Sequence, residues 1–221
     1  MTAARAGRHA RRAGHRRSLV ALHLRARGAP AFAGGLAVVT LASWGAAHWL
    51  TSREWSGGAI ERWPVVALAP ALTAALASTG LAGSDEELER TTAVPWRRIR
   101  VLHVIIVVVV AGAALVLVAL WEPQTYGAFE LARNTVACVG AVALLAVVLG
   151  ARLAWGPVCA YVCVVTLVMP QPLVPESSWW TWPVQPWSAE LAAWTAGALF
   201  AAGLLLYGRL GPRPSRDEDD A

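Results

Sequence analysis

Apolar residues fall along this chain in six blocks separated by polar, charged or proline-rich stretches. The blocks cover about 31–50, 64–83, 101–121, 132–150, 154–170 and 189–208. Most are close to the length that a helix needs to cross about 30 Å of hydrocarbon at about 1.5 Å per residue. The blocks do not alternate apolar and polar residues with a period of two, which argues against a membrane-spanning β-barrel. The pattern predicts an all-α, polytopic membrane protein with six transmembrane helices.

Composition supports this prediction. Of the 221 residues, 57% are hydrophobic and only 15% are charged, whereas about a quarter of the residues of a soluble domain are charged. All 19 basic residues are arginine, and the sequence contains no lysine. A Walker A phosphate-binding loop requires its lysine, so this sequence does not encode a P-loop ATPase.

The arginines predict the orientation, because short cytoplasmic segments of membrane proteins are enriched in Arg and Lys. If six helices are threaded from a cytoplasmic N-terminus, sixteen arginines lie inside and only Arg53, Arg62 and Arg133 lie outside. We therefore expect both termini to be cytoplasmic. Residues 1–30 then form a basic cytoplasmic arm, 31–208 the six-helix transmembrane domain, and 209–221 a cytoplasmic tail with an acidic end.

The arm contains one amphipathic stretch, SLVALHLRAR (18–27). Leu19 and Leu22 share one helical face and the arginines lie on another, as in a short helix lying in the headgroup layer. It acts either as a site for anionic lipids or simply as an anchor that fixes the orientation. The two roles can coexist.

The loop between the second and third blocks, SDEELERTTAVPWRRIR (84–100), carries the most concentrated charge. Ser84 and Glu87 have the spacing of a capping box, and the acids of the first turn suit the helix dipole. We expect a short helix that ends before Pro95. The residues that follow it are expected to anchor the chain at the inner headgroups: Trp96, Arg97, Arg98 and Arg100.

On the outer side, the loop 171–188 has no basic residue and four tryptophans: Trp179, Trp180, Trp182 and Trp187. Tryptophan prefers the headgroup region, and with four prolines the loop is expected to form a structured cap that dips into the interface. The segment FELARNT opens the fourth block with Glu130, Arg133 and Asn134 on one side of the helix start. This cluster is either a local helix cap or a polar gate at the outer mouth of a pathway.

No group of residues in the sequence points to catalysis. The blocks carry no acid at mid-membrane depth, no HExxH metal motif and no serine near a membrane histidine. Cys138, Cys159 and Cys163 lie in apolar surroundings and are interpreted as small packing residues rather than a metal site. We expect neither a metal nor a cofactor bound by this chain, and no enzymatic activity.

The layout resembles the membrane subunit of ABC type-2 exporters. The similarity rests on a cytoplasmic N-terminus, the interfacial helix 18–27, six spans, a helical loop between spans two and three, and a large outer loop between spans five and six. At the local level LERTTAVPWRRIRVLH, ARNTVACVG and LGARLAW resemble segments of uncharacterised actinobacterial integral membrane proteins. The chain departs from the family in one respect, because its loop between spans two and three is short.

The resemblance implies a multi-pass permease in a bacterial plasma membrane. It implies a homodimer whose two copies enclose a pathway, with ATP bound by a separate ABC ATP-binding protein and not by this chain. The helix that docks on this ATPase would comprise Asp85, Glu86, Glu87, Leu88, Glu89 and Arg90. The mostly apolar spans suit a hydrophobic or amphipathic substrate, and no nucleic acid partner is expected. Two alternatives stay open: a non-transporting membrane scaffold or assembly protein, and a small intramembrane enzyme.

Overall fold

The structure is a computed structural model of the chain, and it describes residues 28–51, 63–81, 96–121, 127–168 and 178–213. Within these ranges the chain forms α-helices, one short 3-10 helix and turns, with no β-strand. The elements are α2 (Ala29–Thr51), α3 (Trp63–Leu81), α5 (Trp96–Trp121), α6 (Ala128–Leu149), α7 (Trp155–Val168), η2 (Trp179–Val184) and α8 (Glu190–Leu210).

Five of these helices, α2, α3, α5, α6 and α8, are long and apolar enough to cross a membrane. The prediction of a helical, multi-pass membrane protein is therefore confirmed. The fifth block, predicted to span 154–170, forms the 14-residue helix α7. At about 1.5 Å per residue α7 is about 21 Å long, shorter than the hydrocarbon core. The third block begins earlier than predicted, because α5 starts at Trp96.

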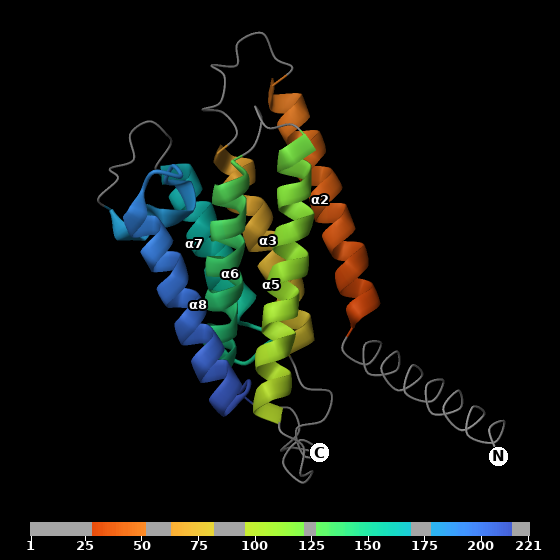
Figure 1. Ribbon diagram of the computed structural model, residues 1–221, viewed down its shortest axis with the longest axis vertical. Helices are drawn as coiled ribbons and strands as arrows, with labels where there is room; N and C mark the ends of the chain where they lie inside the picture. The colour runs from red at the N-terminus through yellow and green to blue at the C-terminus, as the bar shows by residue number, and fades with distance from the viewer. Residues whose placement is uncertain (1–27, 52–62, 82–95, 122–126, 169–177, 214–221) are drawn as a thin grey trace, which may run out of the picture.

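Helices that follow one another in the sequence run in opposite directions, so the bundle has two distinct ends (Figure 1). At one end the C-terminal turns of α3, α6 and α8 meet. There the Tyr207 hydroxyl donates to the Leu81 carbonyl at 2.8 Å, and the Arg213 N–H donates to the Ala146 carbonyl at 2.9 Å. We call this the arginine end, because six arginines lie there: Arg97, Arg98, Arg100, Arg152, Arg209 and Arg213. The opposite end, which carries η2, is the cap end.

Glycines in the left-handed conformation close two helices at the arginine end. Gly150 has φ 84° and Gly211 has φ 76°. Their N–H groups donate to the carbonyls of Ala146 and Tyr207, which terminates α6 and α8. A residue with a side chain would be strained at both positions, so these glycines define where the two helices stop.

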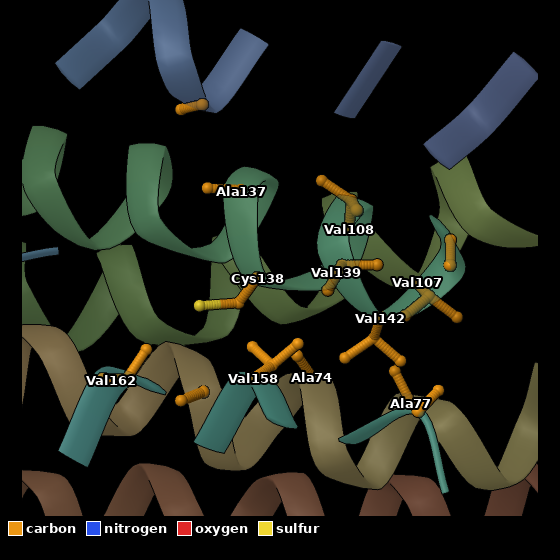
Figure 2. Close-up of a cluster of buried hydrophobic side chains, with 14 of the residues drawn as sticks. Ala74, Ala77, Val107, Val108, Ala137, Cys138, Val139, Val142, Val158 and Val162 are labelled. Carbon is orange, nitrogen blue, oxygen red and sulfur yellow. The ribbon is translucent and has the colours of Figure 1, made fainter. Parts of the chain in front are cut away.

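The core is built around α6, which packs against α3, α5, α7 and α8. Figure 2 shows small apolar side chains of α3, α5, α6 and α7 meeting there, among them Ala74, Val107, Val139 and Val158. The closest approach is between α6 and α8. A Cβ atom added at Gly140 would lie only 2.5 Å from the Phe200 Cα, and one added at Gly203 would collide with the Gly140 carbonyl. Small residues thus let these two helices approach backbone to backbone.

Several sequence predictions concern residues outside the described ranges. These are the interfacial helix 18–27, the acid-rich segment 84–90 and the acidic end of the tail. They stay predictions.

Candidate functional site

Residues 178–189, which comprise η2 and the turn after it, form a compact cap on the bundle (Figure 1). Thr181, Trp182 and Gln185 of the cap are buried, whereas Trp179 and Trp187 are exposed. Gln185 stabilises the cap from within, because its side-chain amide donates to the Ser178 carbonyl and to the Thr181 hydroxyl. Of the four tryptophans predicted to face the headgroups, Trp182 is instead packed in the interior of the protein, and the other three are exposed.

Prolines in the cap leave backbone carbonyls that other helices satisfy. A 3-10 helix joins each carbonyl to the N–H three residues later, and proline has no N–H. Pro183 therefore leaves the Trp180 carbonyl open, and the Tyr161 hydroxyl of α7 donates to it. Just past the end of η2, Pro186 offers no N–H to the Pro183 carbonyl either, and the Asn134 amide donates to this carbonyl at 2.8 Å. The two prolines thus account for two of the carbonyls to which other helices donate, those of Trp180 and Pro183.

The Asn134 amide also binds a carbonyl of α3 that a proline leaves without a donor. Pro70 lies inside α3, so the Val66 carbonyl four residues earlier lacks its helical donor. The second Asn134 N–H donates to the Val66 carbonyl at 3.1 Å. The Asn134 side chain is fully buried, and its two amide protons bind the carbonyls of Val66 and Pro183, for which the prolines supply no N–H.

Arg133 holds the rest of the cap. Its guanidinium donates to the carbonyls of Gln185 at 2.7 Å, Trp182 at 3.0 Å and Pro186 at 3.1 Å. Its Nε donates to the Asn134 Oδ1 at 3.2 Å. A buried arginine in a membrane protein is costly unless such acceptors surround it, and here three carbonyl dipoles point at one cation. We call Arg133 and Asn134, with the cap carbonyls they bind, the cap latch.

The three residues of the predicted outer gate make different contacts. Arg133 and Asn134 are adjacent and face the cap, whereas the Glu130 carboxylate folds back over Gly127 at the start of α6. A gate role stays a prediction. In this conformation Arg133 and Asn134 both donate to cap carbonyls, and Asn134 also donates to the Val66 carbonyl of α3.

A second feature lies toward the arginine end, between α2 and α3. It is a cavity of about 640 Å³, lined by Val39, Leu72, Ala75, Leu76, Ser78, Thr79, Arg152 and Trp155. We call it the α2–α3 groove. It is open to the surroundings of the bundle, because Leu72 is 51% and Trp155 46% exposed.

Polarity changes along the groove. From Leu72 to Thr79 the α3 wall covers eight residues, or about 10 Å. The part near Val39 and Leu72 is apolar, while Arg152 and Trp155 come from the turn after α6 and the start of α7. The Ser78 and Thr79 hydroxyls donate back to carbonyls of α3 at 2.7 and 2.8 Å. The lining also includes the N–H donors of the Arg152 guanidinium and the Trp155 indole.

The predicted headgroup anchors occupy the first two turns of α5. Arg97 and Arg98 are exposed, and Trp96 and Arg100 are half-buried, with Arg100 beside Gly211 of α8. All four lie at the arginine end, the level at which interfacial anchors act in a membrane protein. Their contact with lipid stays a prediction.

The cysteines occupy three different environments. Cys138 is buried, Cys163 is exposed, and the Cys159 thiol lies 3.6 Å from the Ala71 carbonyl. Within the described ranges no three His, Cys, Asp or Glu side chains gather in a way that could hold a metal ion.

Sequence reasoning did not identify Tyr161, Gln185, Arg152 or Trp155 as site residues. A signal existed for Tyr161, because Pro183 has no N–H for the Trp180 carbonyl, to which Tyr161 donates. For Arg152 and Trp155 the sequence offers little, since the groove depends on how closely α2 approaches α3.

Comparisons with protein families, with characterised proteins and with solved structures give no match to this chain. The cap latch and the groove are therefore interpreted on their own geometry.

Proposed function

We propose that this chain is the transmembrane subunit of an ATP-driven exporter of the ABC type. In this proposal two copies act together in a bacterial plasma membrane. A separate ATP-binding protein supplies the energy, and a hydrophobic or amphipathic molecule is moved.

The observation that carries the proposal is the position of α3. This helix supplies five of the eight residues that line the groove: Leu72, Ala75, Leu76, Ser78 and Thr79. It ends at Leu81, and the acid-rich segment 85–90 follows within a few residues. A partner that moved this segment would therefore move the wall of the groove directly.

Charge supports the proposed orientation. Six of the seven arginines in the described ranges lie at the arginine end, and the seventh, Arg133, is bound by the cap. The positive-inside rule then favours a cytoplasmic arginine end. The segment 85–90 would emerge on the side where ATP is available.

The test is co-purification with the ATP-binding protein encoded nearest to this chain's gene. We expect the native chain to bind this protein and to stimulate its ATP hydrolysis. A variant with Glu86, Glu87 and Glu89 changed to alanine is expected to lose both properties. The matched control changes Asp217, Glu218 and Asp219 of the tail to alanine, which removes the same charge elsewhere.

Unchanged binding and stimulation by the 86/87/89 variant would remove the coupling role. If no ATP-binding protein associates with the native chain, the exporter proposal fails.

One observation favours a second candidate, a membrane scaffold that transports nothing. The side chains of the cap latch donate to cap carbonyls, and Asn134 also donates to the Val66 carbonyl of α3, so these residues join the cap to the bundle. A scaffold would bind its partner without any dependence on ATP. Persistence of every partner interaction in the 86/87/89 variant would favour it.

A further inference from the structure

We propose that the α2–α3 groove binds one anionic amphiphile, with its hydrocarbon chain along α3 and its phosphate or carboxylate head at Arg152. This proposal deepens the proposed function, and it rests on that function only for the role of the ligand as cargo. Binding itself requires no ATPase and can be tested without one.

The first argument is the distribution of chemistry along the groove. Val39, Leu72 and Leu76 offer only hydrocarbon, whereas Arg152 and Trp155 at the other end carry N–H donors. A ligand that satisfies both parts needs an apolar chain and a polar head in that order. The volume, about 640 Å³, lies within the range of about 300–1,000 Å³ that small-molecule sites occupy.

The second argument concerns the sign of the head. The hydroxyl protons of Ser78 and Thr79 are directed to carbonyls of α3 at 2.7 and 2.8 Å. The Arg152 guanidinium carries the positive charge of the lining, and its five N–H donors are enough for more than one partner. We therefore assign the head to Arg152, with the Trp155 indole beside it. A guanidinium is planar, always charged and suited to bidentate contact with phosphate or carboxylate. A cationic head is repelled by the same charge, and a zwitterionic head gains less than an anionic one because it carries a cation beside its phosphate.

The third argument is access. The groove lies against α2, the least buried long helix of the bundle, and Leu72 and Trp155 at its rim are about half exposed. It ends at the arginine end, where the headgroups of one leaflet are expected. A lipid-like molecule could enter sideways from that leaflet with its head already at the depth of Arg152. A water-soluble ligand would have to displace hydrocarbon to reach the same place.

The experiment uses the full chain in phosphatidylcholine nanodiscs that contain phosphatidylglycerol with a photoactivatable group in its acyl chain. Crosslinked peptides are mapped by mass spectrometry. We expect labelling at 72–79 of α3, and competition by unlabelled phosphatidylglycerol or by oleate. Phosphatidylcholine and inorganic phosphate, tested separately, should not compete. The phosphatidylglycerol and oleate arms distinguish a phosphate head from a carboxylate head.

Three variants sharpen the test. Arg152→Gln is expected to reduce labelling at 72–79 about tenfold, and Arg152→Lys to restore part of it, because one charge-assisted contact is lost and then partly replaced. Arg209→Gln is the matched control, since Arg209 is also an exposed arginine at the arginine end but does not line the groove. Its labelling should equal that of the native chain. Size-exclusion profiles check that each variant is folded.

Equal loss in Arg152→Gln and Arg209→Gln would overturn the proposal, because a diffuse positive surface would then explain the result. Labelling by photoactivatable phosphatidylcholine as strong as by phosphatidylglycerol would also overturn it, since the groove would bind chains without regard to the head. Failure of this binding test leaves the exporter proposal standing, and failure of the ATPase test leaves the binding site standing.

Discussion

Helices α6 and α2 are almost equal in length and both are long and apolar enough to cross a membrane, yet their places in the bundle differ completely. In the apolar stretch of α6, 61% of the residues are buried inside the protein, against 6% in that of α2. Figure 1 shows α6 in the middle of the bundle and α2 along its edge. Hydrophobicity therefore does not decide which helix is central.

The difference lies in polar and small residues. Lipid tails are as apolar as leucine, so helices in a membrane associate through close packing and hydrogen bonds. α6 carries Arg133 and Asn134, which bind the cap and α3, and Gly140, which lies against the backbone of α8. α2 packs through Gly35 on the side chain of Leu76 and contributes Val39 to the groove. α6 holds the bundle together, and α2 leaves room for a ligand.

The largest effect should come from the cap latch. Arg133→Met keeps the length of the side chain but leaves the cap carbonyls without their donor. We expect a loss of about 3–5 kcal/mol in the free energy of unfolding, as for other buried charge networks that lose one partner. Denaturant titration in detergent micelles measures it. Arg98→Met, at an exposed position of α5, should cost less than about 0.5 kcal/mol. Equal losses in the two variants would refute the special role of the latch.

A matched pair of glycines comes next. Gly140→Ala places a methyl group 2.5 Å from the Phe200 Cα, and a backbone cannot move aside easily. We expect a loss of about 3 kcal/mol, the upper end for overpacking. Gly35→Ala on α2 meets only the Leu76 Cδ2 at 2.8 Å, the end of a side chain that can rotate. Its effect on the same unfolding titration should be below about 1 kcal/mol. A Gly35→Ala variant as unstable as Gly140→Ala would show that α2 packs as tightly as α6.

Leucines on the two helices give a smaller contrast. Leu131 of α6 is 2% exposed and Leu41 of α2 is 66% exposed. Leu131→Ala should lower the free energy of unfolding by about 2 kcal/mol, less than is usual for the core of a water-soluble protein. In lipid the substitution leaves a cavity but loses little transfer free energy, because lipid tails are as apolar as leucine. Leu41→Ala should change stability by less than about 0.5 kcal/mol, because the residue faces lipid in both states. Thermal unfolding of both variants tests this, and a reversed order would contradict the assigned burial.

The smallest effect concerns two threonines that bond to their own helices. Thr135 of α6 and Thr40 of α2 each donate to the carbonyl four residues earlier, both at 2.7 Å. Changing either to valine removes a hydroxyl whose acceptor already belongs to the helix. We expect losses of no more than about 0.6 kcal/mol for both. A loss above about 2 kcal/mol in Thr135→Val alone would mean that its hydroxyl has a further role in the core.

Much of the fold could be predicted from the sequence, because length and hydropathy determine which segments can cross a membrane. The helix boundaries lie close to the blocks at α2, α3, α6 and α8. The length of α7 was less predictable, because the apolar block there covers 154–170 and the structure describes a helix over Trp155–Val168. Whether the chain crosses the membrane a sixth time belongs to the proposal and not to the observed helices.

The candidate site shows where sequence reasoning stops. Sequence spacing was enough to group Glu130, Arg133 and Asn134. It cannot show that Arg133 and Asn134 bind a cap about 50 residues further along the chain. Nor can it show that the Glu130 carboxylate turns back to Gly127. Their partners are carbonyls, which every residue has, so no residue type in the cap marks them. Only the prolines give a hint, through the N–H groups they lack. The groove is even harder to predict from the sequence, because it depends on where α2 packs relative to α3.

The central claim is that the arginine end of the bundle and the segment 84–90 lie on the cytoplasmic side while the cap faces outward. The most direct test replaces Cys138, Cys159 and Cys163 by alanine and then introduces single cysteines, Ser188→Cys in the cap and Arg98→Cys at the arginine end. Intact bacterial cells are treated with a membrane-impermeant maleimide. We predict that Ser188→Cys is labelled at once and Arg98→Cys only after the cells are permeabilised. Labelling of Arg98→Cys in intact cells, with Ser188→Cys protected, would contradict the account.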